Sequence, residues 1–276
     1  MKRKISLLIA MSMTAIVLLT GCGADSKKSA ADANTFKVGL EAGYAPFNWT
    51  QMDNSNGGVK IQGAAEYAGG YDVEIAKKVA EGLGKELVIV KTEWDGLVPA
   101  LTSGKIDAIV AGMSPTAKRK ETIDFTDNYY KSDLVMVVKK GSKYENATSI
   151  KDFSGAKITA QLNTFHYSVI DQIQGVSKET AMDNFPTMRV ALESGKIDGY
   201  VSERPEGVSA SAANANFKMV EFKDGFTTSD DDTAIAVGVK KSSELTAKIN
   251  EVLKGISEEE RGKIMDNAIK NQPAAK

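Results

Sequence analysis

The amino-acid sequence predicts an α/β fold made of two similarly built lobes that enclose a cleft. Strand-like runs alternate along the chain with amphipathic helical stretches, which is the pattern of α/β proteins. A segment also recurs: residues 100–112 read ALTSGKIDAIVAG and residues 191–203 read ALESGKIDGYVSE, with eight of 13 positions identical at an offset of 91. Each copy predicts a helix end, a glycine cap and a strand. The alternative interpretation is that a short glycine-capped turn recurs by chance.

The first lobe begins with clear local signals. Phe36–Leu40 predicts a strand. In Asp72–Leu83 the apolar residues fall on one broad helical face, and Gly84 follows where a left-handed cap is expected. Leu87–Lys91 is rich in β-branched residues and predicts the next strand.

We expect the chain to pass between the lobes twice. Leu134–Lys139 predicts the strand that crosses into the second lobe, and the polar cluster Asp224–Thr233 brings the chain back. Ala234–Val239 then predicts a strand and Ser242–Ile256 a terminal helix. The expected boundaries are residues 36–130 with 229–276 for lobe 1 and residues 131–228 for lobe 2.

The repeat also predicts where a ligand binds. It places Gly112 and Glu203 at matching strand ends, one in each lobe. Ligands of open parallel sheets bind beyond the carboxyl ends of the strands. Two such edges that face each other enclose a cleft between the lobes.

The first 35 residues predict export and anchoring. Residues 2–4 are basic and precede the mainly apolar run Ile5–Leu19, which is too short for a stable transmembrane helix. The following Leu-Thr-Gly-Cys22 resembles the bacterial lipobox, in which the Cys thiol is joined to diacylglycerol. We therefore expect a signal peptide over 1–21, lipidation of Cys22 and a flexible tether over 22–35. The alternative is a free core cysteine near an ordinary signal cleavage site.

The composition argues against several classes of function. The formal net charge is −1, and charges of both signs are mixed without a basic stripe, so nucleic-acid binding is not expected. Cys22 is the only cysteine, so no intramolecular disulfide is possible. With His166 as the only histidine, the sequence offers neither a typical metal site nor a nucleophilic triad. We expect no cofactor.

Several spaced motifs resemble one protein family. In chain order they are Tyr44–Phe47 (YAPF), Gly70–Val73 (GYDV), Trp94–Pro99 (WDGLVP), Gly112–Arg119 (GMSPTAKR), Ile123–Tyr130 (IDFTDNYY) and Gln161–Thr164 (QLNT). They resemble the extracytoplasmic solute-binding proteins of ABC transporters, family 3, which bind polar amino acids. The resemblance runs from Phe36 to Ile256 in the family's order.

The resemblance implies a two-lobed fold of the periplasmic-binding-protein type (type II), with two strands crossing between the lobes. It implies that the cleft closes on an amino acid, which a membrane permease with its separate ATPase subunits then takes up. Together with the lipobox, it implies a monomer that is lipid-anchored at the extracellular face of the bacterial cytoplasmic membrane.

The resemblance also assigns the groups that bind the amino-acid backbone. In the family the Arg at position 119 grips the α-carboxylate, and backbone N–H groups near Gly112 and Ser114 and the hydroxyl of Thr164 assist it. Guanidinium suits this task because its paired donors match a carboxylate. Glu203 stands where the family usually has Asp, which accepts from the α-ammonium.

Four further positions resemble those that select the ligand's side chain. Tyr44 and Trp94 match two groups that sandwich it, Glu41 matches an acidic position, and Gln161 lies at a neighbouring specificity position. A cation gains about 0.5–2 kcal/mol over an aromatic ring. The combination favours a basic amino acid, with arginine first and glutamine or histidine next.

The sequence departs from the family in two places that bear on the ligand. Asn163 stands where the family usually has Gly. Residues 51–68 are longer than the usual turn and predict a hairpin or a flap over the cleft. For His166 there are two interpretations, a contact to the ligand or, as we favour, a polar surface or capping residue.

Two other classes of function compete with capture for transport. The same fold hosts a few prephenate- or arogenate-dehydrating enzymes, in which Glu203 would serve as an acid. Because Arg119 and Glu203 account for each other as a zwitterion clamp, we do not expect an enzyme. A surface sensor or adhesin is the other alternative, and the sequence does not separate it from transport.

Overall fold

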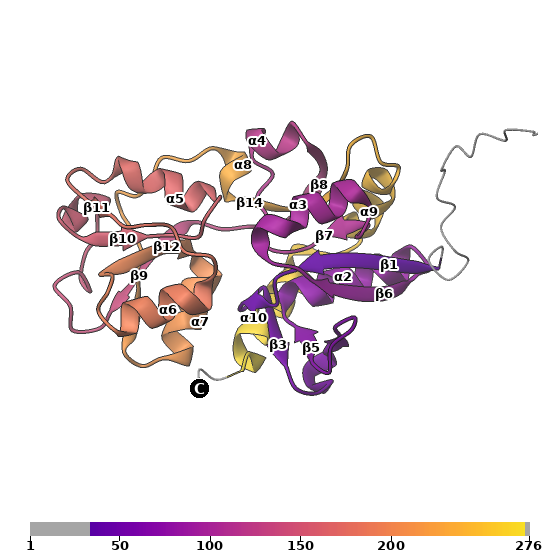
Figure 1. Cartoon of the computed structure of the whole chain (residues 1–276), viewed down its shortest axis with the longest axis horizontal. Coiled ribbons are helices and arrows are strands. Elements are labelled where there is room, and N and C mark those ends of the chain that lie inside the picture. The colour runs from indigo at the N-terminus through magenta and orange to yellow at the C-terminus, as the bar shows by residue number, and fades with distance from the viewer. Residues whose placement is uncertain (1–33, 274–276) are drawn as a thin grey trace, which may run out of the picture. The chain divides into compact units, whose positions relative to one another are not determined.

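The computed structural model describes residues 34–273, which form two five-stranded sheets, a smaller four-stranded sheet and the helices around them (Figure 1). The first sheet has the order β6 (Glu86–Lys91), β1 (Thr35–Leu40), β7 (Ala108–Ile109), β14 (Ala234–Lys240) and β8 (Ile123–Lys131). The second has the order β11 (Ser177–Lys178), β10 (Lys157–Thr159), β12 (Gly199–Glu203), β9 (Leu134–Lys139) and β13 (Phe217–Val220).

The two large sheets share one topology. In each, the first three strands are parallel, and the fourth and fifth are each antiparallel to the strand before them. The recurring segment supplies the third strand of both, β7 in the first sheet and β12 in the second. The helices that lead into these strands are α3 (Trp94–Ser103) and α6 (Phe185–Glu193). The expectation of two similarly built lobes is therefore confirmed, and the repeat marks equivalent places in them.

The chain passes between the two large sheets twice. Leu134–Lys139 is not itself the crossing strand, since all of it pairs within the second sheet. The crossing occurs at Ser132 and Asp133, directly after β8. The return runs from the end of β13 through α8 (Asp230–Thr233) into β14. The N–H of Ser132 donates to the carbonyl of Thr233 (3.0 Å), so the two passages lie side by side.

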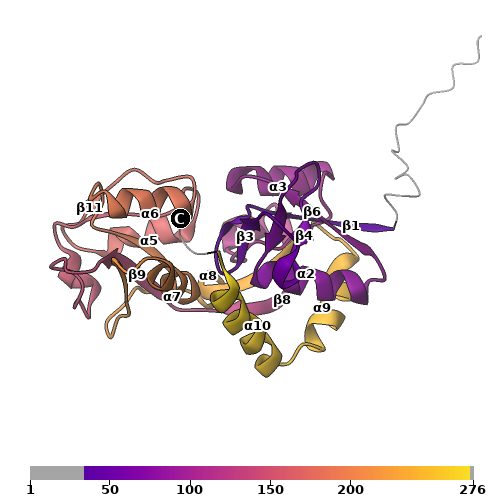
Figure 2. The same cartoon turned by 90° about the horizontal axis from the view of Figure 1, so that it is seen from below.

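The expected helix over 72–83 is α2 (Tyr71–Gly82), and Gly84 has the left-handed φ of +63° that the cap requires. The terminal helix is α9 (Leu245–Lys254), and a further helix, α10 (Glu258–Asn271), follows it. Figure 2 shows α10 in yellow, and it contacts both α2 and α7 (Arg204–Ala213). The remaining helices are η1 (Ser55–Gly57), α4 (Ala117–Lys120), η2 (Ile150–Phe153), α5 (Phe165–Val169) and η3 (Ile170–Gln172).

The long segment 51–68 folds as part of the small sheet, which has the order β2 (Gly43–Tyr44), β3 (Asn48–Gln51), β5 (Tyr67–Gly69) and β4 (Val59–Lys60). Its tip at Asn56 and Gly57 shares a surface pocket with α2 and α10. The hairpin expectation is met. The flap expectation is not, because no residue of 51–68 lines the cavity described below.

The buried apolar side chains form two clusters. The larger one extends from β1, α2 and α3 to Phe185, Met188 and Tyr200 of the second sheet and its helices. The smaller one lies within the second lobe and includes Phe153 and Ile158. Residues 34–273 contain no helix with the length and apolar character that crossing a membrane requires. The predicted signal peptide, the lipidation at Cys22 and most of the tether lie outside the described residues.

Candidate ligand-binding site

Eight of the nine predicted ligand-binding residues line one cavity. Its walls are formed by Tyr44, Trp94, Gly112, Ser114, Arg119, Gln161, Thr164, Phe165, His166, Phe185 and Glu203. Glu41, the ninth, is buried behind this wall and bonded to Gln161. The free volume is only about 10 Å³, roughly the space of one water molecule, because side chains from the two lobes meet inside it.

The parallel strands of both sheets explain why these residues come together. Glu41 directly follows β1, Trp94 follows β6 and Gly112 follows β7. In the second sheet the segment from Gln161 follows β10, and Glu203 ends β12. All therefore lie at the carboxyl edges of parallel strands, where open sheets of this kind bind ligands.

Arg119 is held by contacts from both lobes. Its Nη1 donates to the carbonyl of Ser114 (2.9 Å), and its Nη2 donates to the carbonyl of Asn163 (3.2 Å). The guanidinium lies over the ring of Trp94, 4.9 Å from its centroid. Burial lowers the pKa of Arg119 to about 10, against the opposing influence of Glu203 and Asp232. The side chain therefore remains cationic at neutral pH.

Gly112 contributes to the cavity through its lack of a side chain, because its backbone N–H is already engaged. Its φ is +61°, and a Cβ there would lie 2.6 Å from the ring of Tyr44. Its N–H already donates to the hydroxyl of Tyr129 (3.2 Å). Ser114 is buried, and its hydroxyl donates to the carbonyl of Asp232 (2.9 Å).

A buried carboxylate supports the Gly112 loop from behind. Asp72 accepts from the hydroxyl of Tyr129 (2.7 Å) and from the amide of Asn48 (2.8 Å). Burial raises the pKa of Asp72 to about 6, although both hydrogen bonds act in the opposite direction. The network Asn48–Asp72–Tyr129 thus fixes the backbone at Gly112.

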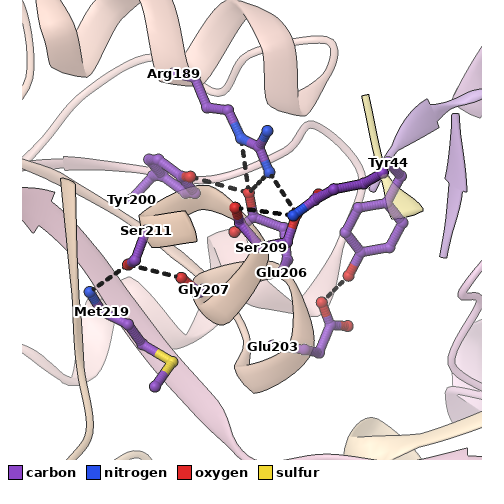
Figure 3. A network of polar contacts seen from close by, with 10 residues as sticks. Tyr44, Arg189, Tyr200, Glu203, Glu206, Gly207, Ser209, Ser211 and Met219 are labelled. Carbon is purple, nitrogen blue, oxygen red and sulfur yellow. Dashed lines mark hydrogen bonds and ion pairs between the residues drawn. The ribbon is translucent and has the colours of Figure 1, made fainter. Parts of the chain in front are cut away.

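Glu203 is the anionic centre of the cavity. It is 2% exposed, and its Oε2 accepts a hydrogen bond from the hydroxyl of Tyr44 across the cleft (Figure 3). Its Oε1 lies 2.9 Å from Nε2 of His166. Burial acts to raise its pKa, but the attraction of His166 and the hydrogen bonds of His166 and Tyr44 outweigh burial and hold the pKa below its ordinary value. Glu203 is therefore ionised at neutral pH.

Glu41 and Gln161 form a second polar pair across the cleft. The amide of Gln161 donates to Oε1 of Glu41 (2.9 Å) and to the carbonyl of Asp183 (3.0 Å). The other carboxyl oxygen of Glu41 is buried and has no hydrogen-bond partner. Burial raises the pKa of Glu41 to about 8; the hydrogen bond from Gln161 lowers it, and the charges of Glu93 and Asp95 raise it further.

Thr164 lies in the same loop, and its hydroxyl donates to the carbonyl of Gln161 (2.7 Å). His166, expected at the surface or as a cap, is instead 6% exposed and faces Glu203, so that expectation was wrong. Phe165 and Phe185 were not predicted. The ring of Phe185 stacks on Tyr44 with centroids 4.3 Å apart and planes 9° apart.

The position of Phe185 in the sequence follows from the internal repeat, although none of the family motifs includes it. It starts α6 as Trp94 starts α3, and the two positions differ by 91, the offset of the repeat. The repeat therefore extends to the aromatic residue that opens each helix and faces the cavity.

A buried ion pair fixes the wall from which Glu203 projects. Glu206 of α7 is fully buried, and one of its oxygens accepts from Nε and Nη2 of Arg189 (3.1 and 2.8 Å) and from the hydroxyl of Tyr200 (3.0 Å) (Figure 3). Arg189 lies on α6, so the pair joins the helix that begins at Phe185 to the helix that follows Glu203.

The site contains no arrangement for metal chemistry. Across residues 34–273, no three His, Cys, Asp or Glu side chains are grouped as metal ligands. The polar groups present are opposed charges, hydroxyls and amides flanked by aromatic rings, which suits a small zwitterion.

Comparison with known proteins gives a consistent assignment. A model of the bacterial extracellular solute-binding proteins, family 3, matches residues 36–270. The arginine-binding extracellular protein ArtP of Bacillus subtilis is 29% identical over 259 residues, which cover 92% of each chain. The L-cystine-binding protein TcyJ of Escherichia coli is 31% identical over 70% of each chain.

Solved structures agree. An amino acid ABC transporter substrate-binding protein from Streptococcus pneumoniae bound to L-arginine has a TM-score of 0.76 at 26% identity, covering 86% of this chain and 95% of that one. An ancestral arginine-binding protein bound to glutamine has a TM-score of 0.70 at 30% identity, covering 84% and 96%. These relatives are substrate-binding transport proteins, not enzymes.

Proposed function

Because this chain belongs to the bacterial extracellular solute-binding proteins of family 3, we propose that it captures a polar α-amino acid in the cavity and delivers it to the permease of an ABC importer. The observation that carries the proposal is the pair of opposite charges on opposite walls. Arg119 comes from the first lobe and Glu203 from the second, and both are ionised at neutral pH. An α-amino acid carries the complementary carboxylate and ammonium.

The same pair gives a physical reason for closure. A ligand bound to one lobe presents an unmatched charge that only the other lobe satisfies, so the ligand stabilises the closed arrangement. The bond Tyr44–Glu203 joins two walls of the cavity, and the bond Gln161–Glu41 joins the lobes behind its wall. With only about 10 Å³ free, these bonds must separate before an amino acid enters.

For the side chain we propose a basic amino acid, with arginine first and glutamine or histidine next. Glu41 has a buried carboxyl oxygen without a partner, and Glu93 and Asp95 add negative charge around it. A guanidinium would donate to the unpartnered oxygen of Glu41 and would offset the repulsion among Glu41, Glu93 and Asp95. Relatives that are named for binding arginine, histidine or glutamine support this order.

We further propose that Cys22 carries a lipid anchor that holds the protein at the outer face of the cytoplasmic membrane. Two acyl chains suffice for stable anchoring. Cys22→Ser should release the protein into the medium and abolish metabolic labelling with palmitate. Retention of the variant in the membrane fraction would refute the anchor.

Calorimetric titration with L-arginine tests the binding proposal. Arg119→Ala should abolish measurable binding while the urea unfolding transition is retained, because the guanidinium faces the cavity and not the apolar core. Unchanged affinity in that variant would refute the clamp. A thermal-shift screen of the common amino acids identifies the ligand, since an excess of about a hundredfold over Kd adds about 2.7 kcal/mol of stability.

A further inference from the structure

We propose that Asn163 is a positioning residue, which fastens the second lobe to Arg119 and to Asp95 across the cleft and so sets Arg119 in place only when the lobes are closed. Asn163 stands where the family usually has glycine. Its role rests on the proposed function, in which Arg119 is the carboxylate clamp.

The backbone at this position explains why asparagine is accepted. Asn163 lies between β10 and α5 with a φ of +56°, in the left-handed region. Asparagine adopts that region more readily than other residues with a side chain. The turn that a glycine would make is therefore kept, and an amide group is added to it.

Both ends of the residue reach the other lobe. The side-chain Nδ2 donates to Oδ1 of Asp95 (2.9 Å), and the backbone carbonyl accepts from Nη2 of Arg119 (3.2 Å). Asp95 is the second residue of α3, next to Trp94, whose ring lies beneath the guanidinium. Asn163 thus contacts Arg119, one member of the stack, and Asp95, the neighbour of the other member, Trp94. A glycine supplies the carbonyl contact alone.

The position of these contacts limits their strength. Asn163 and Asp95 are both exposed, so their bond lies at the rim of the cleft, where water competes. A single hydrogen bond of this kind changes an equilibrium by about three- to tenfold. We expect this change in affinity to arise mainly from the dissociation rate of the ligand, because the bond between Asn163 and Asp95 forms after the ligand has entered.

Two substitutions of Asn163 separate the contacts. Asn163→Gly keeps the left-handed turn and the carbonyl but removes the amide, and should weaken L-arginine binding about three- to tenfold. Asn163→Asp places a carboxylate against Asp95 and should weaken it more. Asp95→Asn combined with Asn163→Asp rebuilds the hydrogen bond with donor and acceptor exchanged, and should restore affinity.

Amide hydrogen exchange of the full chain, without added amino acid, provides a second measurement. Peptides covering residues 92–97 and 160–166 should exchange faster in Asn163→Asp and return to the wild-type rate in the double variant. Asn56→Gly is the matched control, since Asn56 also has a left-handed φ (+51°) but lies away from the cavity. It should alter neither measurement.

The outcomes are distinct. Wild-type exchange and affinity in Asn163→Asp would overturn the inference, as would a loss that Asp95→Asn fails to rescue, because a merely local strain is not repaired by a partner in the other lobe. Failure of the wild-type chain to bind L-arginine would count against the proposed ligand, and the exchange measurement would still decide the role of Asn163.

Discussion

The two lobes have one scaffold but opposite chemistry. The repeat places Trp94 and Phe185 at the starts of α3 and α6, and Gly112 and Glu203 at the ends of the strands that follow. The first lobe contributes the cation Arg119, and the second contributes the anion Glu203. The residues shared by the two copies build the helix–turn–strand unit, and of the positions that differ, the last one, Gly112 in one copy and Glu203 in the other, lines the cavity. The scaffold that the two lobes share therefore determines where the cavity residues lie. The residues at the strand ends and in the loops after them determine which charge each lobe contributes.

The aromatic residues that open α3 and α6 give the largest expected effect. Phe185 is fully packed between Tyr44 and the core, and Trp94 lies beneath Arg119. Phe185→Ala and Trp94→Ala should each lower the free energy of unfolding by about 3–5 kcal/mol, measured by urea denaturation. A loss below about 1 kcal/mol in only one of them would show that the two positions are not equivalent.

The charge at the end of the second copy comes next. Glu203→Gln keeps the shape of the side chain but removes the anion opposite Arg119. Loss of one partner of a buried charge pair costs about 2–5 kcal/mol, so the Kd for L-arginine should rise by at least about thirtyfold in calorimetry. Gly112→Ala serves as the comparison at the equivalent position in the first lobe, where the defect is steric. It should weaken binding without changing its dependence on salt, whereas Glu203→Gln should change that dependence.

Two of the buried carboxylates of the site, Glu203 and Glu41, differ in the direction of their pKa shift. Glu203 is paired and its pKa is lowered, whereas Glu41 has a raised pKa of about 8 because burial dominates there. Glu41 therefore carries a proton at pH 6, and a guanidinium ligand must displace it. Affinity for L-arginine should rise by up to about tenfold per pH unit between pH 6 and 8 and level off above that range.

Titrations at pH 6, 7 and 8 in two buffers of different ionisation enthalpy check this, since proton release accompanies binding below pH 8. Glu41→Gln is the control. It removes the group to which the pH dependence is assigned and leaves the other titrating groups of the cleft in place, so the slope should flatten. L-Glutamine should show a shallower slope than L-arginine. Equal slopes for both ligands would remove the argument for a basic side chain.

The fold was predictable because its signals are local. The glycine caps, the alternation of strands and helices and the repeat together define both lobes. The helix α10 was missed although Ser257, whose hydroxyl accepts from the N–H of Glu260 (3.2 Å), is a recognisable start signal. Its polar sequence has little apolar periodicity, and its packing against α2 and α7 depends on the tertiary structure.

The site was only partly predictable. Arg119 and Glu203 follow from strand ends and motifs, and both line the cavity. The bonds of Gln161 to Glu41 and of Asn163 to Asp95 depend on how the loop after β10 meets the first lobe, and the burial of His166 depends on how the same loop packs against Glu203 at the end of β12. No local pattern determines such contacts, because each partner lies more than 30 residues away along the chain.

The smallest expected effect tests whether the scaffold of the two copies is energetically equivalent. Gly104 and Gly195 occupy matching turns with φ of +83° and +74°. An alanine at either position would have to adopt a left-handed φ, which destabilises the folded state by about 1 kcal/mol. Gly195 has open space where a Cβ would lie, whereas at Gly104 the Cβ would lie 3.0 Å from Nζ of Lys240, the end of a flexible side chain. Gly104→Ala and Gly195→Ala should therefore each lower the free energy of unfolding by about 1 kcal/mol in urea denaturation, with L-arginine affinity unchanged. A cost at Gly104 well above that at Gly195 would mean that Lys240 cannot move aside, and that packing against the return strand β14 has made the first copy more rigid than the second.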